Sequence, residues 1–436
     1  MGQARTVPPR TRWGVFDVQS SSRDQPGWSQ FRWLWSAHTA SIFGSQLSTV
    51  AIPLLAIASL DADAFDLSLL TAAALAPYLV AGLFIGVWVD RVRKRPLLIA
   101  ADLARAICIV AIPILVWTDR LTLPNLIALT ALHGTLTVVF NVADVSFLPS
   151  IVPRSELPRA NARLALSTSV ARVGGPAAAG AIIGYLSAPI ALVIDALSYL
   201  VSGLFVSRIR SDGAAVTQQQ REPVLRALGQ GFATLRHTPI LFALVASAGL
   251  TSMFGMAFQT VLLIFLVERF DMDAARIGLL LAMGGAGALC GSLLSGRMVR
   301  VLGIGPAIVR AQWLFGLAGL MLPAALLLPE RAAPVVIGAS LFIQLAFNTV
   351  REVNGAAVSQ AVIPPELLGR TQSTSLVSIK LLEVAGSLAA GALAVAIGSS
   401  AAIVILEVGM LFAIAPMIGS PIPAIVSLSQ LDAQDA

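Results

Sequence analysis

Six charged residues are predicted to lie at membrane depth within long apolar stretches of the sequence, where a charge is costly and usually has a function. They are three acids and three bases: Asp144, Arg172, Arg351, Glu352, Lys380 and Glu383. Equal numbers of each sign are expected if these charges pair. A buried carboxylate whose partner changes could bind and release a proton. The set is therefore a candidate for proton coupling, and the alternative is static ion pairs that orient helices.

Depth along the chain predicts which of these charges meet. Glu352 lies 11 residues before position 363, the end of its apolar run, and Lys380 lies 11 residues after position 369, where the next run begins. At 1.5 Å per helical residue, both are about 16 Å deep. We therefore expect a Glu352–Lys380 pair between neighbouring helices, which Glu383 could share from three residues further along. Asp144 is the corresponding candidate of the first half of the chain.

The composition identifies the elements that must hold these charges. Hydrophobic residues make up 57% of the 436 residues, charged residues 12%, and the mean hydropathy is +0.84. Soluble domains carry roughly 25% charged residues. We predict an all-α protein that crosses a membrane many times, and we exclude a secreted disulfide-bonded or a disordered protein. Cys108 and Cys290 lie in apolar runs and indicate neither a disulfide nor a metal site.

Twelve apolar runs are long enough to cross a bilayer as helices. They cover residues 33–60, 68–88, 97–118, 124–149, 159–186, 189–207, 239–266, 276–298, 306–328, 333–362, 370–397 and 400–420. The predicted organisation is a cytoplasmic tail (1–32), a six-helix bundle (33–207), a polar cytoplasmic linker (208–238), a second six-helix bundle (239–420) and a cytoplasmic tail (421–436). The N-terminal tail is too long and polar for a cleavable signal peptide.

Basic residues predict the orientation of the chain. With the N-terminus in the cytoplasm, twenty Lys and Arg residues fall on inner segments and three, Arg120, Arg269 and Arg331, on outer ones. This asymmetry places both termini inside. It also explains the formal charge of +6 without a nucleic-acid partner.

The two halves of the sequence repeat each other, which is the usual plan of secondary transporters. Matching residues recur at an offset near 210: Gly175 with Gly386, Gly180 with Gly391, Asp195 with Glu407, and Phe140-Asn141 with Phe347-Asn348. Asn141 and Asn348 are matched candidates to line a cavity. We predict two pseudo-symmetric bundles around a common cleft.

The loop after the second run carries a spaced motif that includes Gly86, Asp90, Arg91, Lys94 and Arg95. This G-x-x-x-D-R-x-x-[RK]-R pattern resembles the loop 2–3 signature of the major facilitator superfamily. The resemblance implies that Asp90 docks at the start of the eleventh span, near Gly369 to Thr371, and gates access. The alternative is that the basic cluster only fixes topology. The copy in the second half has Val299 in place of the aspartate.

The fifth run carries Gly174, Gly175, Pro176 and Gly180, a pattern similar to the glycine-proline motif of exporters in this superfamily. Ordinary packing of small residues is the alternative interpretation. Residues 147–153, 156–161 and 195–199, with 31–35 and 100–106, resemble the branch that contains enterobactin exporters and macrolide-efflux proteins.

The remaining polar residues of the apolar runs receive more modest interpretations. Asp102 and Arg105 are expected to support the gate loop, with substrate contact as the alternative, and Asp195 and Glu407 to pack helix ends. Isolated residues such as His38, His133 and Gln259 are expected to be satisfied packing groups.

Taken with the resemblance, these features predict proton-driven efflux of a small amphipathic compound, such as an antibiotic, siderophore or secondary metabolite, by alternating access. The expected partners are the lipid bilayer of the cell membrane, the substrate and protons, and the expected state is a monomer without cofactor or metal. The alternatives are import of a small nutrient and a non-transporting scaffold or sensor. An enzyme or ATP-driven pump is not expected, because neither Lys94 nor Lys380 belongs to a phosphate-binding loop.

Overall fold

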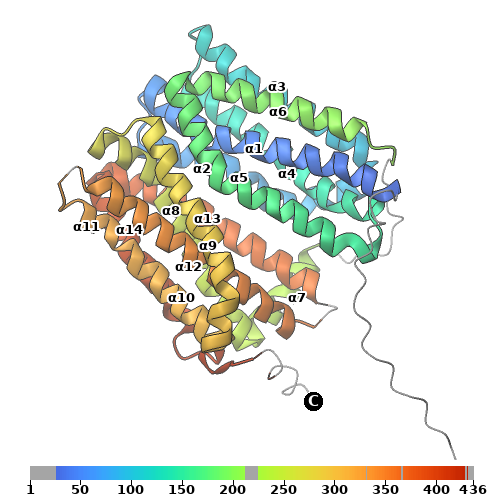
Figure 1. Cartoon of the computed structure of the whole chain (residues 1–436), viewed down its shortest axis with the longest axis vertical. Coiled ribbons are helices and arrows are strands. Elements are labelled where there is room, and N and C mark those ends of the chain that lie inside the picture. The colour runs from blue at the N-terminus through green and yellow to red at the C-terminus, as the bar shows by residue number, and fades with distance from the viewer. Residues whose placement is uncertain (1–25, 212–223, 330, 365–366, 428–429, 431–436) are drawn as a thin grey trace, which may run out of the picture.

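The computed structural model describes residues 26–211, 224–329, 331–364, 367–427 and 430, and it does not describe a few side chains within helices, among them those of Gly86 and Asp90. Regular structure in these ranges is helical throughout (Figure 1). Ten of the described helices are long and apolar enough to cross a membrane. Beside them, α2 offers a shorter apolar stretch, Ala64–Leu79, and α5 carries Arg159, Arg163 and Arg172.

The helices form two sets that lie side by side in Figure 1. The first half of the chain contains α1 (Pro26–Leu60), α2 (Ala64–Asp90), α3 (Lys94–Trp117), α4 (Leu123–Ile151), α5 (Leu157–Tyr185) and α6 (Ala188–Ser207). The second half contains α8 (Pro239–Phe270), α9 (Ala274–Leu302), α10 (Ile304–Gly319), α11 (Met321–Ala325), α12 (Ala333–Val362), α13 (Leu368–Ile397) and α14 (Ser399–Leu411). Between them lies α7 (Val224–His237).

Capping residues explain why such long helices are joined by short loops. Asp63 and Asp66 form a reciprocal capping box at the start of α2. Thr122 and Asp273 accept hydrogen bonds from backbone amides in the first turns of α4 and α9. Gly303, with φ of 86°, is the single residue between α9 and α10, and this left-handed backbone favours glycine.

Each half uses the same scheme of helix contacts. In the first half, α1 packs on α5 and α6, α2 on α4, and α3 on α4 and α6. In the second half, α8 packs on α13 and α14, α9 on α12, and α10 on α12 and α14. Two helix pairs, which we call seams, join the halves: α2 with α13, and α5 with α9. In the predicted repeat, α2 corresponds to α9 and α5 to α13, so the two seams are equivalent.

Repeated glycines make the closest approaches along the two seams. A Cβ atom at Gly180 would overlap the Ala274 carbonyl oxygen and lie 2.8 Å from the Cα of Gly278. A Cβ atom at Gly391 would lie 2.8 Å from the Ala64 carbonyl oxygen. The predicted repeat partners therefore occupy equivalent places at the starts of α9 and α2, where only a glycine lets the backbones touch.

Four segments differ from the sequence prediction. The polar linker 208–238 contains the amphipathic helix α7, which packs on α13 and α8. The ninth run is interrupted near residue 320, and the last one ends in a 3-10 helix, Phe412–Met417, that contains Pro416. Proline removes a backbone donor, so the regular α-helix stops there. Of the predicted N-terminal tail, residues 26–32 belong to α1, and residues 1–25 lie outside the described part of the chain.

The helix ends define two opposite faces of the molecule. The basic face is formed by the helix ends at residues 91–93, 152–156, 208–211, 303 and 363–364, and the opposite face by those at 61–63, 118–122, 186–187, 271–273 and 326–332. The Gly180 and Gly391 contacts lie toward the opposite face.

Candidate functional site

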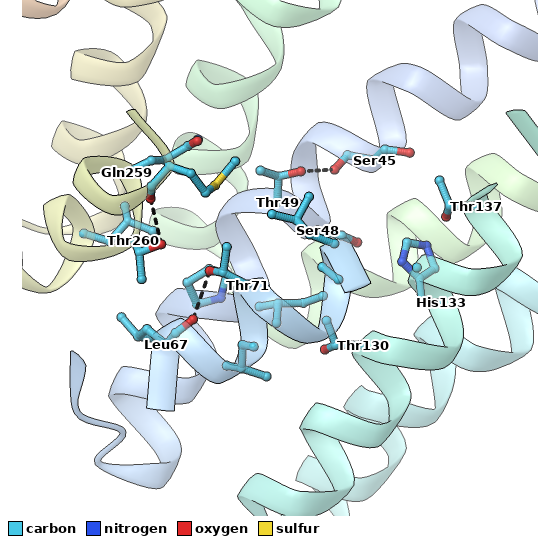
Figure 2. A pocket seen from close by; sticks show the side chains of 18 of the residues that line it. Ser45, Ser48, Thr49, Leu67, Thr71, Thr130, His133, Thr137, Gln259 and Thr260 are labelled. Atoms are coloured by element: carbon cyan, nitrogen blue, oxygen red, sulfur yellow. Dashed lines mark hydrogen bonds between the residues drawn. The ribbon is translucent and has the colours of Figure 1, made fainter. Parts of the chain in front are cut away.

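A cavity of about 370 Å³ lies where α1, α2 and α4 of the first half meet α8 of the second. Figure 2 shows its polar lining: Ser45, Ser48 and Thr49 from α1, Thr71 from α2, Thr130, His133 and Thr137 from α4, and Gln259 and Thr260 from α8. We call it the central cavity. Its lining is otherwise largely aliphatic.

Helical spacing explains how α4 contributes to this lining. Thr130, His133 and Thr137 recur at intervals of three and four residues, so one face of α4 carries all three. Among the described residues, the hydroxyls of Thr130 and Thr137 have no hydrogen-bond partner, and both oxygens are buried. A buried hydroxyl without a partner is unusual, and both side chains belong to the cavity lining.

Behind His133 and Ser45 lies a buried hydrogen-bonded network. The hydroxyl of Tyr199, on α6, is 3.0 Å from His133 Nε2 and 3.0 Å from Ser45 Oγ. Asp195, one turn earlier on α6, accepts hydrogen bonds from Ser48 and, at 3.2 Å, from Ser198. Asp195 and Tyr199 are both fully buried. The sequence interpretation of His133 as an isolated packing residue missed this network.

The network continues to an ion pair inside the first half. Arg105 pairs with Asp102 one turn away on α3, and both are buried. The Arg105 guanidinium lies 3.9 Å from the centre of the Phe140 ring and 4.4 Å from that of Tyr199, as in cation–π contacts. These contacts lie inside the first half of the chain and reach Tyr199, which bonds to two residues of the central cavity. Among the described residues, neither Asp102 nor Arg105 contacts the predicted gate loop.

Asp144 pairs with a residue that the sequence analysis treated as a packing group. His38 Nδ1 is 3.4 Å from Asp144 Oδ2, and His38 Nε2 is 3.5 Å from Thr168 Oγ1. The second Asp144 oxygen has no hydrogen-bond partner among the residues that the structure describes. The pair joins α1 to α4 within the first half of the chain.

The predicted Glu352–Lys380 pair is wrong. Lys380 Nζ donates to Glu383 Oε2 at 2.7 Å, because a residue three positions along the same helix is nearer than one on α12. Lys380 also lies 5.5 Å from the centre of the Tyr78 ring, a contact between the halves. The Tyr78 hydroxyl accepts from Asn141 Nδ2 at 3.2 Å, so the cavity candidate Asn141 contacts a residue that lines the central cavity.

Arg351, Glu352 and Asn348 form a separate group on α12. Arg351 Nη2 donates to Asn348 Oδ1 at 2.7 Å and lies 3.6 Å from Glu352 Oε1. Asn348 Nδ2 donates to that same carboxylate oxygen at 3.0 Å. Arg172 is exposed, and it forms no ion pair with any residue that the structure describes.

Two basic residues of the predicted gate motif, Lys94 and Arg95, cap helix ends with their side chains. Lys94 donates to the carbonyl oxygens of Val89 and Val92, and Arg95 Nη2 donates to that of Ser207 at 2.6 Å. Cations stabilise helix C-termini, which here are those of α2 and α6. The predicted gate contact of Asp90, like any packing of Gly86, lies outside the described side chains and stays a prediction.

The two adjacent glycines of the glycine-proline segment of α5 differ in how closely neighbouring helices approach them. A Cβ atom at Gly175 would overlap Gln46 of α1, whereas one at Gly174 would meet nothing within 4 Å. The carbonyl of Pro176 and the backbone of Gly180 approach Gly278 of α9. Close helix packing is therefore one role of this segment.

Asp195 and Glu407, predicted to pack helix ends, are both fully buried. Glu407 accepts from Gln344 Nε2 at 3.3 Å. Among the described residues, no group of three or more His, Cys, Asp or Glu side chains could hold a metal ion.

Comparison with known proteins assigns this architecture. The family model of the Major Facilitator Superfamily matches residues 34–377. The MFS-type transporter YvqJ of Bacillus subtilis is 26% identical over 63% of this chain, and the match covers 62% of YvqJ. Macrolide efflux protein A of Streptococcus pyogenes is 24% identical over 79% of this chain and 84% of its own length. The crystal structure of the nucleoside transporter NupG superposes with a TM-score of 0.73 at 10% identity, covering 89% of this chain and 99% of that one.

Proposed function

Because this chain belongs to the Major Facilitator Superfamily, we propose that it is a secondary active transporter that exports a small amphipathic compound in exchange for protons. Its twelve membrane spans would form two six-helix bundles that rock about the central cavity. Both termini would lie in the cytoplasm, so that the basic face is the inner one. In this proposal the protein works as a monomer in the cell membrane.

The observation that carries the proposal is the pair of equivalent seams around a cavity. The cavity draws its walls from α1, α2 and α4 on one side and α8 on the other, so relative motion of the halves would change it. The seams α2–α13 and α5–α9 are related by the sequence repeat. Such a duplicated frame supports two alternative packings around one site, which is what alternating access requires.

The lining of the central cavity favours an amphipathic substrate. Aliphatic side chains cover most of the wall, and hydroxyl, imidazole and amide groups provide a few directed hydrogen bonds. Binding sites of this kind take an apolar body and orient it through a small number of polar contacts. Similarity to macrolide efflux protein A supports export rather than import.

Two ion pairs are the candidates for proton coupling. His38–Asp144 lies in the first half, and Lys380–Glu383 lies on α13, which forms a seam with α2. In each pair, protonation of the carboxylate would remove the negative charge that holds the partner and so weaken the pair. If the pair forms in only one access state, protonation biases the equilibrium between the two.

A susceptibility screen tests the proposal. The chain is expressed in a drug-hypersensitive bacterial host and challenged with antibiotics and siderophores of varied charge. We expect resistance to at least one amphipathic compound, lost in Asp144→Asn and Glu383→Gln and retained in Asp61→Asn, which alters an exposed loop acid. Sensitisation would indicate import, and unchanged susceptibility to the whole panel would contradict efflux of these compounds.

A further inference from the structure

A second cavity, of about 400 Å³, lies within the second half between α8, α12 and α13. Its polar wall includes Ser252, Arg351, Glu352, Gln360, Gln372 and Ser375, and most of the remaining lining is aliphatic. Gln360 and Gln372 are near the end of α12 and the start of α13, so the cavity extends toward the basic face. We call it the basic-side cavity.

Arg351 is a buried cation whose hydrogen-bonding capacity is largely unused. The residue is 5% exposed. Within the described part of the chain, Nη2 is the one guanidinium nitrogen that contacts polar groups, and Nε has no hydrogen-bond partner. Arg351 lies 11 residues before Val362, the end of α12, which places it about 16 Å along the helix. A guanidinium at this depth with incomplete pairing is expensive to maintain.

Glu352 does not satisfy Arg351. Its nearest oxygen is 3.6 Å from Nη2, its side chain is 58% exposed, and Asn348 holds the same oxygen. A closed pair would instead present two parallel N–H···O bonds to the carboxylate. Arg105 shows the contrast, because it is buried against Asp102 and two aromatic rings and lines neither cavity.

We propose that Arg351 binds a carboxylate group of the transported compound in the basic-side cavity. The five N–H donors of a guanidinium match the geometry of a carboxylate. Arg351 lines the basic-side cavity, and its Nε and Nη1 make no polar contact with the described residues. Leu244 and Leu376 would cover the apolar part of the same molecule. The substrate is therefore an amphipathic organic acid, an inference that rests on the proposed transport function.

Binding of a matched set of naphthalene probes tests this assignment. The full chain is purified into nanodiscs of zwitterionic phosphatidylcholine, and binding of radiolabelled 2-naphthoate is measured at equilibrium, with methyl 2-naphthoate as the uncharged competitor. We expect saturable binding of the acid that the ester does not displace. Arg351→Gln should weaken binding by about tenfold or more, since hydrogen bonds to charged groups are the strong ones.

Two further variants separate recognition from folding. Arg351→Lys keeps the positive charge but loses the planar guanidinium with its paired N–H donors, so we expect naphthoate to bind more weakly than to the wild type. Arg310→Gln removes an exposed arginine on α10 that lines neither cavity, and it should bind naphthoate as the wild type does. Equal binding of acid and ester, or unchanged binding by Arg351→Gln, would overturn the proposal.

An anionic lipid headgroup offers the same chemistry as a free acid. The measurement is therefore repeated in nanodiscs that contain phosphatidylglycerol. Binding of naphthoate in both lipids supports the soluble acid, whereas absence of naphthoate binding in the zwitterionic discs contradicts it. The nanodisc experiment needs no gradient, so naphthoate binding without any gradient-driven transport would preserve the Arg351 site and refute the transport function.

Discussion

Replacement of Gly180 by alanine should move the two halves apart at the opposite face. The added methyl group would overlap the Ala274 carbonyl oxygen and lie 2.8 Å from Gly278 Cα, and backbone atoms cannot turn away as a side chain can. Overpacking of this kind costs about 1–3 kcal/mol. If the seam is intact in only one access state, that state loses about 5- to 150-fold in relative population.

Gly184→Ala is the matched control on the same helix. Its Cβ atom would lie 3.4 Å from the Cβ of Ala275, an ordinary contact. Both substitutions replace a helical glycine by alanine and so share the same gain of about 1 kcal/mol in helix propensity. The difference between the two variants therefore isolates the effect of the seam.

Pulsed electron–electron resonance can measure the displacement. Spin labels are attached to cysteines at Asp119 and Arg331, exposed loop positions on the opposite face, one in each half. Cys108 and Cys290 are first replaced by serine. We expect the distance distribution of Gly180→Ala to gain a longer component that Gly184→Ala lacks. Identical distributions for the two variants would refute the reasoning that this glycine contact closes the face.

Three other substitutions test the networks around the cavities. Lys380→Met should lower the free energy of unfolding by about 3–5 kcal/mol, because it leaves the Glu383 carboxylate without its cation. The double variant Lys380→Met/Glu383→Gln should recover most of this free energy, and both values can be measured by denaturation. Tyr199→Phe removes a hydroxyl with two hydrogen-bonding neighbours while keeping the ring, and should cost about 1–3 kcal/mol in the same assay. Thr137→Val should leave stability within about 0.5 kcal/mol but raise the KM for transport, because Thr137 lines the central cavity. Thr135→Val should leave KM unchanged, because the Thr135 hydroxyl bonds within α4 and the residue lines neither of the two cavities.

Features that depend on local pattern were predictable from the sequence. Hydropathy locates the helices because the bilayer leaves a backbone few other ways to satisfy its polar groups. The offset between Gly180 and Gly391 predicted a duplicated chain, and in the structure these two glycines make close approaches at equivalent places in the two halves. The resemblance to the superfamily and to macrolide-efflux proteins is likewise confirmed by the family model and the curated relatives.

Features that depend on which helix faces which were not predictable. Depth alone paired Glu352 with Lys380, although Glu383 is within reach on the same helix. His133 looked isolated because its partner Tyr199 is 66 residues away in the sequence. The polar composition of the linker concealed α7, which is stabilised by packing on α13 rather than by its own hydropathy.

Transport into inverted membrane vesicles tests the central claim most directly. Vesicles with an acidified lumen are prepared from cells that express the chain, and uptake of a compound identified by the susceptibility screen is followed. Proton-driven export predicts that the compound accumulates in the lumen and is released when a protonophore collapses the gradient. Accumulation that persists after the protonophore, in vesicles that remain sealed, would contradict the proposed proton-driven mechanism.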